Sequence, residues 1–599
     1  MEKLEKARKP KGKNISGTPF GTWMRTDQPI PNLITGCTSI TELFDKVASK
    51  YGQRNAFGQR SVLDENPDVQ ANGRVFKKYV LGDYQWITYE EAQKRIDDIA
   101  SGFLENGIKR GDIVMIMADT RSEWMLSALA LIKIGATVAT LYATLGEDGI
   151  IHGLNETEVT HVITNQDLLS KLVKVVGKTP MVRHIIYFEG FKKSVTENFP
   201  PEIKVTSFKM VEELGKLKVF PSVYPKAKEN DLAILMYTSG STGIPKGVML
   251  THRNILASAN GYSVMGPILS CEDIVCAYLP LAHVLEMASE FFWMSCGMAI
   301  GYGSPLTITD KSTGLQKGCK GDFSVLKPTI AAAVPLVLDR IRKGILEELQ
   351  TKGVFAKQLF DFVVDYKRKW TKQGYRTPIV NVLVCRKISE VLGGRIRYIP
   401  VGGAPLGSDT HEFIEACFDC TLLQGYALTE VAAAGTLMAA GELSSGRVGA
   451  PLGGVKVKLV DWEEGNYRVT DKPYPRGEVV IGGSNVSKGY YKNDKLTEES
   501  YYEEDDERWF LTGDIAEIWP DGTVKIVDRR KDLVKLQFGE YVSLGKVEAE
   551  LKCSNYVDNV SCVLWREKFF HFPIELSIKF FFPFLIFRFV LLVIHFTIT

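Results

Sequence analysis

A run of small hydroxyl residues and glycines, closed by one lysine, follows the apolar stretch Leu232 to Met236. It reads Tyr-Thr-Ser-Gly-Ser-Thr-Gly-Ile-Pro-Lys-Gly-Val over residues 237–248. Glycines let a backbone approach phosphate oxygens closely, hydroxyl groups donate hydrogen bonds, and the lysine charge complements an anion. The Walker P-loop is excluded because Pro245 stands where that motif needs glycine. The alternative interpretation is a flexible surface loop, but the full string favours a nucleotide phosphate site. The residues expected to bind phosphate are Thr238, Ser239, Gly240, Ser241, Thr242, Gly243 and Lys246.

This string resembles the phosphate loop of the adenylate-forming enzymes, the superfamily of acyl-CoA synthetases, luciferases and peptide-synthetase adenylation domains. A second segment, Trp509 to Leu536 with Gly539 to Val542, is similar to the fatty acyl-CoA synthetase signature. That segment separates the chain from luciferases and peptide-synthetase domains. The resemblance extends from about Ser39 to Asn559.

Two short segments supply further parts of the implied nucleotide site. The first segment contains Gly403, Ala404 and Pro405. Its glycine backbone leaves room for a flat base, and the resemblance places these three residues around adenine. In the second, it implies that Tyr426 stacks on adenine, that Thr429 holds the α-phosphate and that Glu430 ligates Mg²⁺. Mg²⁺ prefers carboxylate and phosphate oxygens. Without the resemblance, a Tyr/Thr/Glu loop is more often an ordinary turn.

Two positions depart from the usual family pattern. Ala427 stands where most members have glycine, and Val401 stands where serine is common. If the turn needs a backbone angle that favours glycine, Ala427 weakens it.

Four more residues complete the implied site. A lone histidine in an apolar run is usually a buried core residue, but the resemblance places His283 beside the reacting carboxylate and the acyl pocket. Asp514 and Arg529 match residues that bind the ribose, and Lys531 matches the pivot of an interdomain hinge. The run of alternating charges around Lys531 would otherwise indicate a solvent-exposed face.

Composition limits the other possibilities. A chain of 599 residues is too long for one core, so we expect at least two domains. Hydrophobic content of 45% and charged content of 24% are ordinary, and a net charge of +2 gives no case for nucleic acid as a partner. Cys417 and Cys420 have the spacing of half a zinc site or a redox pair, but no suitable second pair accompanies them. Buried thiols in a reducing compartment are the favoured interpretation.

Helical and strand patterns alternate between about Ser39 and Phe220, which predicts an α/β fold with crossover helices. Helices are expected over Ile40 to Tyr51 and Tyr89 to Asn106, and another over Asp339 to Lys372. We expect a large, multi-subdomain adenylate-forming domain and a small α+β C-terminal domain that is incomplete here. The predicted parts are a partly disordered N-terminal arm (1–38), the large AMP-binding domain (39–527), the hinge (528–533), a partial small domain (534–568) and an atypical hydrophobic tail (569–599).

The tail departs from the family, and none of its residues matches the lysine that in members contacts the substrate carboxylate and α-phosphate. Three interpretations are open. Phe580 to Ile598 could span a membrane, since nineteen residues at about 1.5 Å each reach about 28 Å, although Arg588 inside it costs about 2.5–3.5 kcal/mol. The tail could instead be a buried helix or strand. We favour an alternative or mispredicted 3′ end on a truncated synthetase, and without the lysine we expect adenylation to be weakened.

The resemblance implies a long-chain fatty acid–CoA ligase that uses ATP, Mg²⁺ and coenzyme A. A fatty carboxylate would attack the α-phosphate to give acyl-adenylate and pyrophosphate, and the thiol of coenzyme A would then displace AMP. The alternative is a truncated, non-catalytic isoform that binds ATP and fatty acid and regulates a partner. Peripheral or tail-mediated association with a membrane, at the cytosolic face of the endoplasmic reticulum or another intracellular membrane, is also expected.

Overall fold

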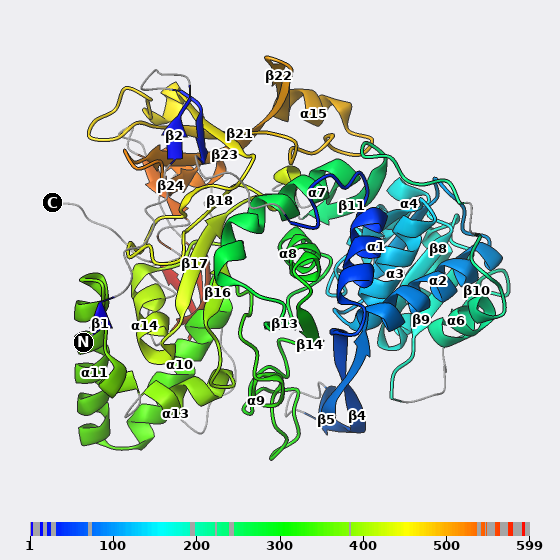
Figure 1. Cartoon of the computed structure of the whole chain (residues 1–599), viewed down its shortest axis with the longest axis horizontal. Coiled ribbons are helices and arrows are strands. Elements are labelled where there is room, and N and C mark those ends of the chain that lie inside the picture. The colour runs from blue at the N-terminus through cyan, green and yellow to red at the C-terminus, as the bar shows by residue number, and fades with distance from the viewer. Residues whose placement is uncertain are drawn as a thin grey trace.

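A seven-stranded sheet in the first half of the chain confirms the expected α/β architecture (Figure 1). The computed structural model describes residues 2–3, 12–15, 21–25, 32–69, 75–191, 198–221, 224–238, 245–381, 385–535, 541–544, 547, 557–562, 573–578 and 590–593. The order of the sheet is β10-β9-β8-β6-β7-β11-β12, and only β11 with β12 is antiparallel. Its strands are β6 (Ile113–Met117), β7 (Thr137–Thr140), β8 (His161–Asn165), β9 (His184–Phe188), β10 (Lys204–Ser207), β11 (Leu232–Thr238) and β12 (Lys246–Thr251).

Helices cover both faces of this sheet. Along β6, Val114 and Ile116 join the core formed with one set of helices, whereas Met115 and Met117 join the core on the other face. A parallel sheet buried on both sides needs such continuously apolar strands. The first set contains α1 (Ile40–Tyr51), α2 (Tyr89–Glu105), α3 (Ser122–Lys133), α6 (Phe208–Lys216), α7 (His252–Gly261) and α8 (Val284–Ser295). The second set contains α4 (Glu147–Thr157) and α5 (Leu169–Val175).

Side-chain caps fix where two of the predicted helices begin. The hydroxyl of Ser39 accepts the backbone N–H of Glu42 at the start of α1. Thr88 and Glu91 form a reciprocal capping box at the start of α2. These caps satisfy backbone N–H groups that have no partner within a helix. The helices predicted over Ile40 to Tyr51 and Tyr89 to Asn106 are thus confirmed to within one residue.

A second sheet begins with a long hairpin that the sequence patterns did not predict. Its order is β13-β14-β4-β5, and the hairpin extends downward in Figure 1. The strands are β4 (Asn55–Val69), β5 (Val75–Thr88), β13 (Ile274–Ala277) and β14 (Ala299–Tyr302). Only the first few residues of β4 are buried, so most of the hairpin lacks the alternating apolar pattern of a half-buried strand.

Parallel strands in the middle of the chain position one edge of the site. β16 (Tyr398–Val401) pairs with β17 (Thr421–Tyr426), which continues through the antiparallel strands β18 (Thr436–Leu437) and β19 (Ala450–Pro451). Because β16 and β17 are parallel, the turns that follow Val401 and Tyr426 lie at the same edge. Isolated bridges from Ile330 to Val275 and to Tyr398 connect β13 with β16.

A buried carboxylate holds β16 in place. The hydroxyl of Thr329 and the guanidinium of Arg397 both donate to Asp273 Oδ1, each at 2.6 Å. Burial raises the pKa of Asp273, but these hydrogen bonds outweigh it and the net pKa lies below its ordinary value. Asp273 thereby connects the start of β13, the segment before α10 and the start of β16.

An antiparallel sheet forms the upper part of Figure 1. Its order is β2-β3-β20-β21-β23-β22, with β24 also paired to β23. The strands are β2 (Gly12–Asn14), β3 (Trp23–Arg25), β20 (Lys456–Val460), β21 (Arg476–Gly482), β22 (Tyr501–Glu504), β23 (Glu507–Ile518) and β24 (Val524–Arg529). Two of these strands belong to the predicted N-terminal arm, so the expected disorder does not extend to residues 12–14 and 23–25. Arg25 explains part of this order, since its Nε donates to the carbonyl of Pro451 at 2.9 Å.

The single helix predicted from Asp339 to Lys372 is wrong, because the structure has two helices there. α10 (Pro335–Thr351) and α11 (Val354–Lys372) are separated at Gly353, which has a φ of 91°. A left-handed backbone ends a helix and is readily adopted only by glycine. Both helices pack beside α14 (Ser408–Phe418), with α9 (Asp322–Leu326) and α13 (Arg386–Ser389) nearby.

The described residues after β24 form short strands. β25 (Leu533–Lys535) pairs with β26 (Tyr541–Ser543), and β27 (Val557–Cys562), β28 (Pro573–Ile578) and β29 (Val590–Val593) form an antiparallel sheet. Most of the predicted hydrophobic span lies outside the described residues, but Val590–Val593 within it is a strand. Among the described residues, no helix combines the length and the apolar character needed to cross a bilayer.

We expect Asp273→Ala to lower the free energy of unfolding by about 1–3 kcal/mol, because it removes a buried, charged acceptor shared by two donors. The control is Asp365→Ala at an exposed position of α11, which should change stability by less than about 0.5 kcal/mol. Chemical denaturation at several pH values measures both. Since the folded-state pKa of Asp273 is lowered, its contribution is fully present above the unfolded pKa of about 3.9 and is lost only below it. Equal stability of the two variants would contradict this assignment.

Candidate active site

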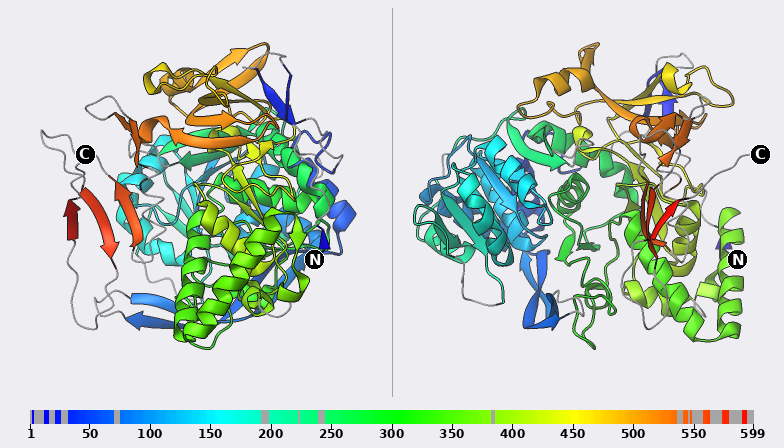
Figure 2. Two further views of the ribbon diagram at one scale, coloured as in Figure 1. Left: turned by 90° about the vertical axis from the view of Figure 1, so that its left-hand side faces the viewer. Right: turned by 180° about the vertical axis from the view of Figure 1, so that it is seen from behind.

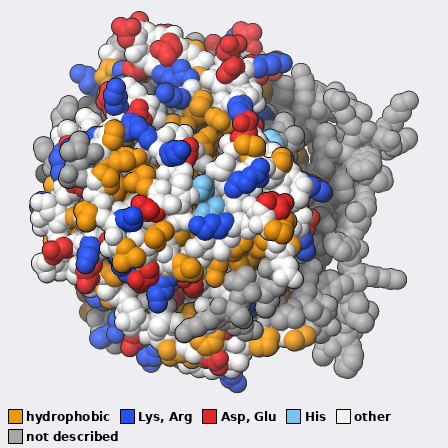
Figure 3. All heavy atoms as spheres, turned by 90° about the vertical axis from the view of Figure 1, so that its right-hand side faces the viewer, with side chains coloured by type: hydrophobic (Ala, Val, Ile, Leu, Met, Phe, Trp, Pro, Cys, Tyr) orange, Lys and Arg blue, Asp and Glu red, His pale blue; other side chains and the backbone are white. Residues whose placement is uncertain are grey.

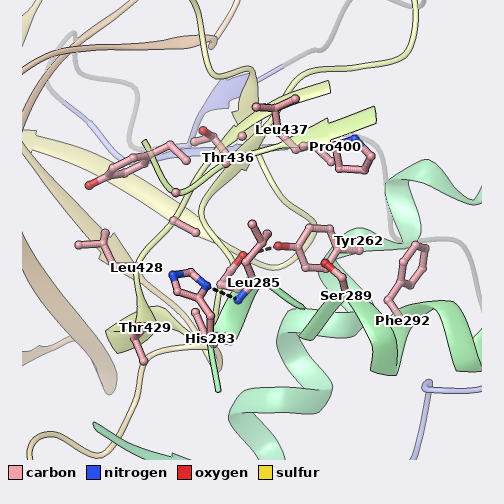
Figure 4. A pocket seen from close by; sticks show the side chains of 18 of the residues that line it. Tyr262, His283, Leu285, Ser289, Phe292, Pro400, Leu428, Thr429, Thr436 and Leu437 are labelled. Atoms are coloured by element: carbon pink, nitrogen blue, oxygen red, sulfur yellow. Dashed lines mark hydrogen bonds between the residues drawn. The ribbon is translucent and has the colours of Figure 1, made fainter. Parts of the chain in front are cut away.

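One cavity gathers residues that are far apart in the sequence. It has a volume of about 240 Å³ and lies where β11, β16 and β17 end and α8 begins. Figure 4 labels lining side chains from β16 (Pro400) and from α8 (Leu285, Ser289 and Phe292). Seven residues that the sequence assigned to the site line this cavity: Thr238, His283, Gly403, Tyr426, Thr429, Glu430 and Arg529. A cavity at the carboxyl ends of parallel strands is a common place for ligands in α/β proteins.

A chain of three polar side chains crosses one wall of the cavity. The hydroxyl of Tyr426 donates to Asp514 Oδ2 at 2.7 Å, and Arg529 Nε donates to Asp514 Oδ1 at 2.7 Å. The side chain of Asp514 is only 6% exposed, whereas that of Arg529 is 53% exposed. Burial raises the pKa of Tyr426, and the negative charge of Asp514 raises it further. The buried carboxylate of Asp514 thus accepts hydrogen bonds from two donors that offset the cost of its burial.

The strand register places this pair. Asp514 on β23 lies opposite Arg529 on β24, and the hairpin between these strands turns at Gly522, which has a φ of 79°. An Asp-Gly pair, here Asp521-Gly522, is typical of such a turn. The backbone N–H of Asp514 also donates to Thr512 Oγ1 at 3.1 Å, which fixes the strand at the carboxylate.

A second set of polar side chains, Lys246, Tyr490 and Glu430, lies where β11 ends and β12 begins. Lys246 begins β12 directly opposite Thr238 at the end of β11, and its ammonium lies 5.1 Å from the ring centre of Tyr490. Tyr490 in turn donates its hydroxyl hydrogen bond to Glu430 Oε1 at 2.7 Å. Burial lowers the pKa of Lys246, the charge of Lys531 lowers it further, and Glu430 opposes this effect. An anion such as a phosphate, bound beside Lys246, would offset the effect of Lys531.

His283 caps helix α8 and lines the cavity. Its Nδ1 accepts the backbone N–H of Leu285 at 3.1 Å (Figure 4). Because this backbone group can only donate, the proton of the neutral ring lies on Nε2. Burial lowers the pKa of His283, which favours the neutral ring. The imidazole therefore offers Nε2–H as a hydrogen-bond donor to a ligand.

The cavity continues between apolar side chains. Tyr262, Phe292 and Trp293 are buried in this wall, and the hydroxyl of Tyr262 donates to the carbonyl of Ala433 at 2.5 Å. Other apolar lining residues are Met265, Val284, Leu285, Leu428 and Leu437. A pocket with a polar end and an apolar end suits an amphipathic substrate.

The predicted adenine turn is only partly at the cavity. Gly403 lines it with a φ of 84°, a conformation that favours glycine. Ala404 and Pro405 are exposed and are not among the lining residues. The concern about Ala427 is unfounded, because its φ is not positive. The left-handed alanines of this segment are Ala432 and Ala433, with φ of 52° and 61°.

Some predicted residues are not described, and some site residues were missed. Ser239, Gly240, Ser241, Thr242 and Gly243 lie outside the described residues, so their binding of phosphate stays a prediction. Tyr490 was missed because it lies sixty residues from Glu430 and belongs to none of the motifs. The apolar lining residues of α8 were missed because their spacing is that of any buried helix.

Comparison with known proteins identifies the family. The family model of AMP-binding enzymes matches residues 63–491. The chain belongs to the AMP-binding enzyme family. This AMP-binding enzyme is 44% identical over 537 residues to long chain acyl-CoA synthetase 8 of Arabidopsis thaliana, a match that covers 88% of this chain and 74% of the relative. It is 32% identical to long-chain-fatty-acid–CoA ligase 2 of Schizosaccharomyces pombe over 543 residues, 88% of this chain and 77% of the relative.

The fold has a solved counterpart. The adenylation domain of carboxylic acid reductase from Segniliparus rugosus, determined with AMP and a co-purified carboxylic acid, superposes with a TM-score of 0.70 at 23% identity. The match covers 91% of this AMP-binding enzyme and 82% of that chain. The adenylate-forming fold expected from the sequence is thereby confirmed.

We expect Tyr426→Phe to weaken AMP binding by about two- to tenfold, because the ring remains while the hydrogen bond to Asp514 is lost. Isothermal titration calorimetry with AMP measures the effect. Tyr187→Phe on β9, where the phenol lies outside the cavity lining, is the control and should bind as the wild type does. Unchanged affinity in Tyr426→Phe would show that the Tyr426 hydroxyl does not order the nucleotide site.

Proposed function

We propose that the protein is a long-chain fatty acid–CoA ligase that forms an acyl-adenylate from ATP and fatty acid and then an acyl-CoA thioester. The observation that carries this proposal is the single cavity that joins the Tyr426–Asp514–Arg529 chain to an apolar wall. Such a cavity can place the reacting groups of a nucleotide and of a fatty acid side by side. The homology to long-chain acyl-CoA synthetases supports the same reaction.

The first step joins the fatty acid to AMP. A carboxylate oxygen attacks the α-phosphorus, the bond to the bridging oxygen breaks, and pyrophosphate leaves with its electron pair. Lys246, at the start of β12 opposite Thr238, and Lys531 would supply positive charge to the phosphates, and Thr429 in the cavity lining can donate its hydroxyl to the α-phosphate. His283 Nε2–H can orient the carboxylate. This chemistry depends on positioning and on charge neutralisation.

The second step transfers the acyl group to sulfur. The thiol of coenzyme A loses its proton to solvent, and its sulfur attacks the carbonyl carbon. The bond between that carbon and the phosphate oxygen breaks, and AMP leaves with the electron pair. Arg529 ends β24 immediately before the segment Arg530–Asp532, which contains the proposed pivot Lys531. A rotation there would exchange the groups that face the adenylate without disturbing the pairing of β23 with β24 before it.

Glu430 is the residue that fits a Mg²⁺ ion. Tyr490 orients one of its carboxylate oxygens, and the residue lines the cavity beside Thr429. Among the described residues, no group of three or more His, Cys, Asp or Glu side chains could hold a metal by itself. This matches the preference of Mg²⁺ for one or two carboxylates together with substrate phosphates. When bound, the ion would neutralise phosphate charge.

We also propose that the enzyme acts at the cytosolic surface of the endoplasmic reticulum or another intracellular membrane. Long-chain fatty acids partition into bilayers because burying each methylene from water is favourable by about 0.8 kcal/mol. An enzyme that consumes such a substrate meets a higher substrate concentration at the membrane surface than in water.

The test is the synthesis of palmitoyl-CoA by the purified protein from palmitate, ATP and coenzyme A. We expect AMP, pyrophosphate and thioester in equal amounts, no reaction when fatty acid is omitted, and at least about a hundredfold lower rate in Lys246→Ala. Lys495→Ala at the start of helix α15 (Asp494–Ser500) is the matched lysine control. Product formation as ADP and phosphate, or ATP binding without any thioester, would contradict the proposal.

A further inference from the structure

Helix α11 carries large apolar side chains on its solvent face. Phe355, Leu359 and Phe362 are 79%, 49% and 66% exposed, and Val354 beside them is 75% exposed. Their spacing of four and three residues puts Phe355, Leu359 and Phe362 in one row along the helix. Tyr366 continues the row, with its ring stacked at 6.2 Å on that of Phe362. We name Phe355, Leu359, Phe362 and Tyr366 the α11 apolar stripe.

The stripe is not needed to hold the helix in the fold. Phe360, Val363 and Val364 are buried on another side of α11, and the rings of Phe360 and Phe413 on α14 lie 6.0 Å apart. Lys367 is also buried there, with its ammonium 3.1 Å from Asp419. Packing therefore already fixes α11, so the apolar stripe is available to a partner. Figure 2 (left) shows α10 and α11 at the outer surface of the molecule.

Charge points to the kind of partner. Several basic side chains of α11 are paired with acidic ones, as Lys367 is with Asp419 and Lys372 with Glu412, whereas Lys369 is exposed one helical turn beyond Tyr366. A helix with aromatic and leucine side chains on one face and basic side chains beside them is the pattern of helices that lie in the surface of anionic bilayers.

A second apolar row offers an internal comparison. Met210, Leu214 and Leu217, in and just after α6, have the same spacing and are 64%, 36% and 81% exposed. That helix has nine residues with two Lys and two Glu, and the row contains no aromatic side chain. On the opposite side of the molecule from α11, Figure 3 shows apolar, basic and acidic side chains interspersed. Aromatic content and the length of the helix thus distinguish the α11 apolar stripe from this row.

The stripe also has a direct connection to the cavity. α10 starts at Pro335, and the preceding Val334 lies close to Gly403, since a Cβ placed on that glycine would be 3.7 Å from Val334 Cγ1. The α10–α11 hairpin therefore leads from the wall of the site to the exposed row. This places the α11 apolar stripe and the wall of the cavity on one continuous element.

We propose that the α11 apolar stripe and the adjacent Lys369 dock the enzyme on the surface of a bilayer that contains anionic phospholipid. The stripe enters the interface between headgroups and acyl chains, and Lys369 contacts lipid phosphate. The biological reason, delivery of fatty acid from the bilayer, rests on the proposed ligase function. The docking itself does not, and can be measured without catalysis.

The test is sedimentation of the full-length protein with vesicles of phosphatidylcholine and phosphatidylserine in a three-to-one ratio, and with vesicles of phosphatidylcholine alone. We expect Phe355→Gln, Leu359→Gln and Phe362→Gln together to weaken binding at least about tenfold, since binding scales with buried apolar area. Glutamine keeps the helical propensity of these positions. Lys369→Gln should weaken binding to the anionic vesicles about fivefold and leave binding to phosphatidylcholine unchanged.

The control is the triple variant Met210→Gln, Leu214→Gln and Leu217→Gln, which we expect to bind as the wild type does. Equal binding of wild type and the α11 variant, or equal losses in both triple variants, would overturn the proposal. A wild-type dimer that dissociates only in the α11 variant, measured by sedimentation velocity without lipid, would overturn it in favour of a second copy of the chain as the partner.

Palmitoyl-CoA synthesis with palmitate delivered in detergent separates the two proposals. The α11 variant should keep wild-type activity in that assay, which also shows that it is folded. Vesicle binding without any ligase activity would overturn the proposed function and leave the docking surface standing. Ligase activity together with equal vesicle binding of the wild type and the α11 variant would overturn the docking proposal and leave the proposed function standing.

Discussion

The buried carboxylate of Asp514 is the constraint on which the site depends. Burying a carboxylate charge is costly unless donors surround it, and here Tyr426 and Arg529 supply them. These donors come from the end of β17 and from β24. The charge therefore requires two different sheets to meet at one place, and the cavity forms at that meeting point.

The same pair connects the site to the segment that follows it. Arg529 is the last residue of β24, and the short helical turn with Lys531 comes next. Nucleotide contact and interdomain movement would thus share one strand. Asp273 has a comparable role in the scaffold, because its buried carboxylate connects three segments that lead to the turn at Gly403. Each of these two carboxylates accepts hydrogen bonds from segments that are distant in the sequence and so holds those segments together.

The sequence predicted an element correctly where neighbouring residues alone determine that element. The helix at Ile40–Tyr51 was predicted with correct ends, because a side-chain cap defines its start and an apolar face defines its length. The β4–β5 hairpin was missed because solvent surrounds most of it, and the break at Gly353 was missed because the apolar pattern continues through it. Motifs identified Glu430, but they could not reveal Tyr490, whose contact depends on how two distant loops fold together.

The measurement that tests the central claim most directly is palmitate-dependent exchange of pyrophosphate into ATP, compared between the wild type and Asp514→Asn. This exchange reports the first half-reaction without coenzyme A. If the Tyr426–Asp514–Arg529 chain orders the nucleotide for attack by a fatty carboxylate, the wild type exchanges and the variant loses at least about tenfold in rate. Exchange that is independent of palmitate, or a variant as fast as the wild type, would contradict the account.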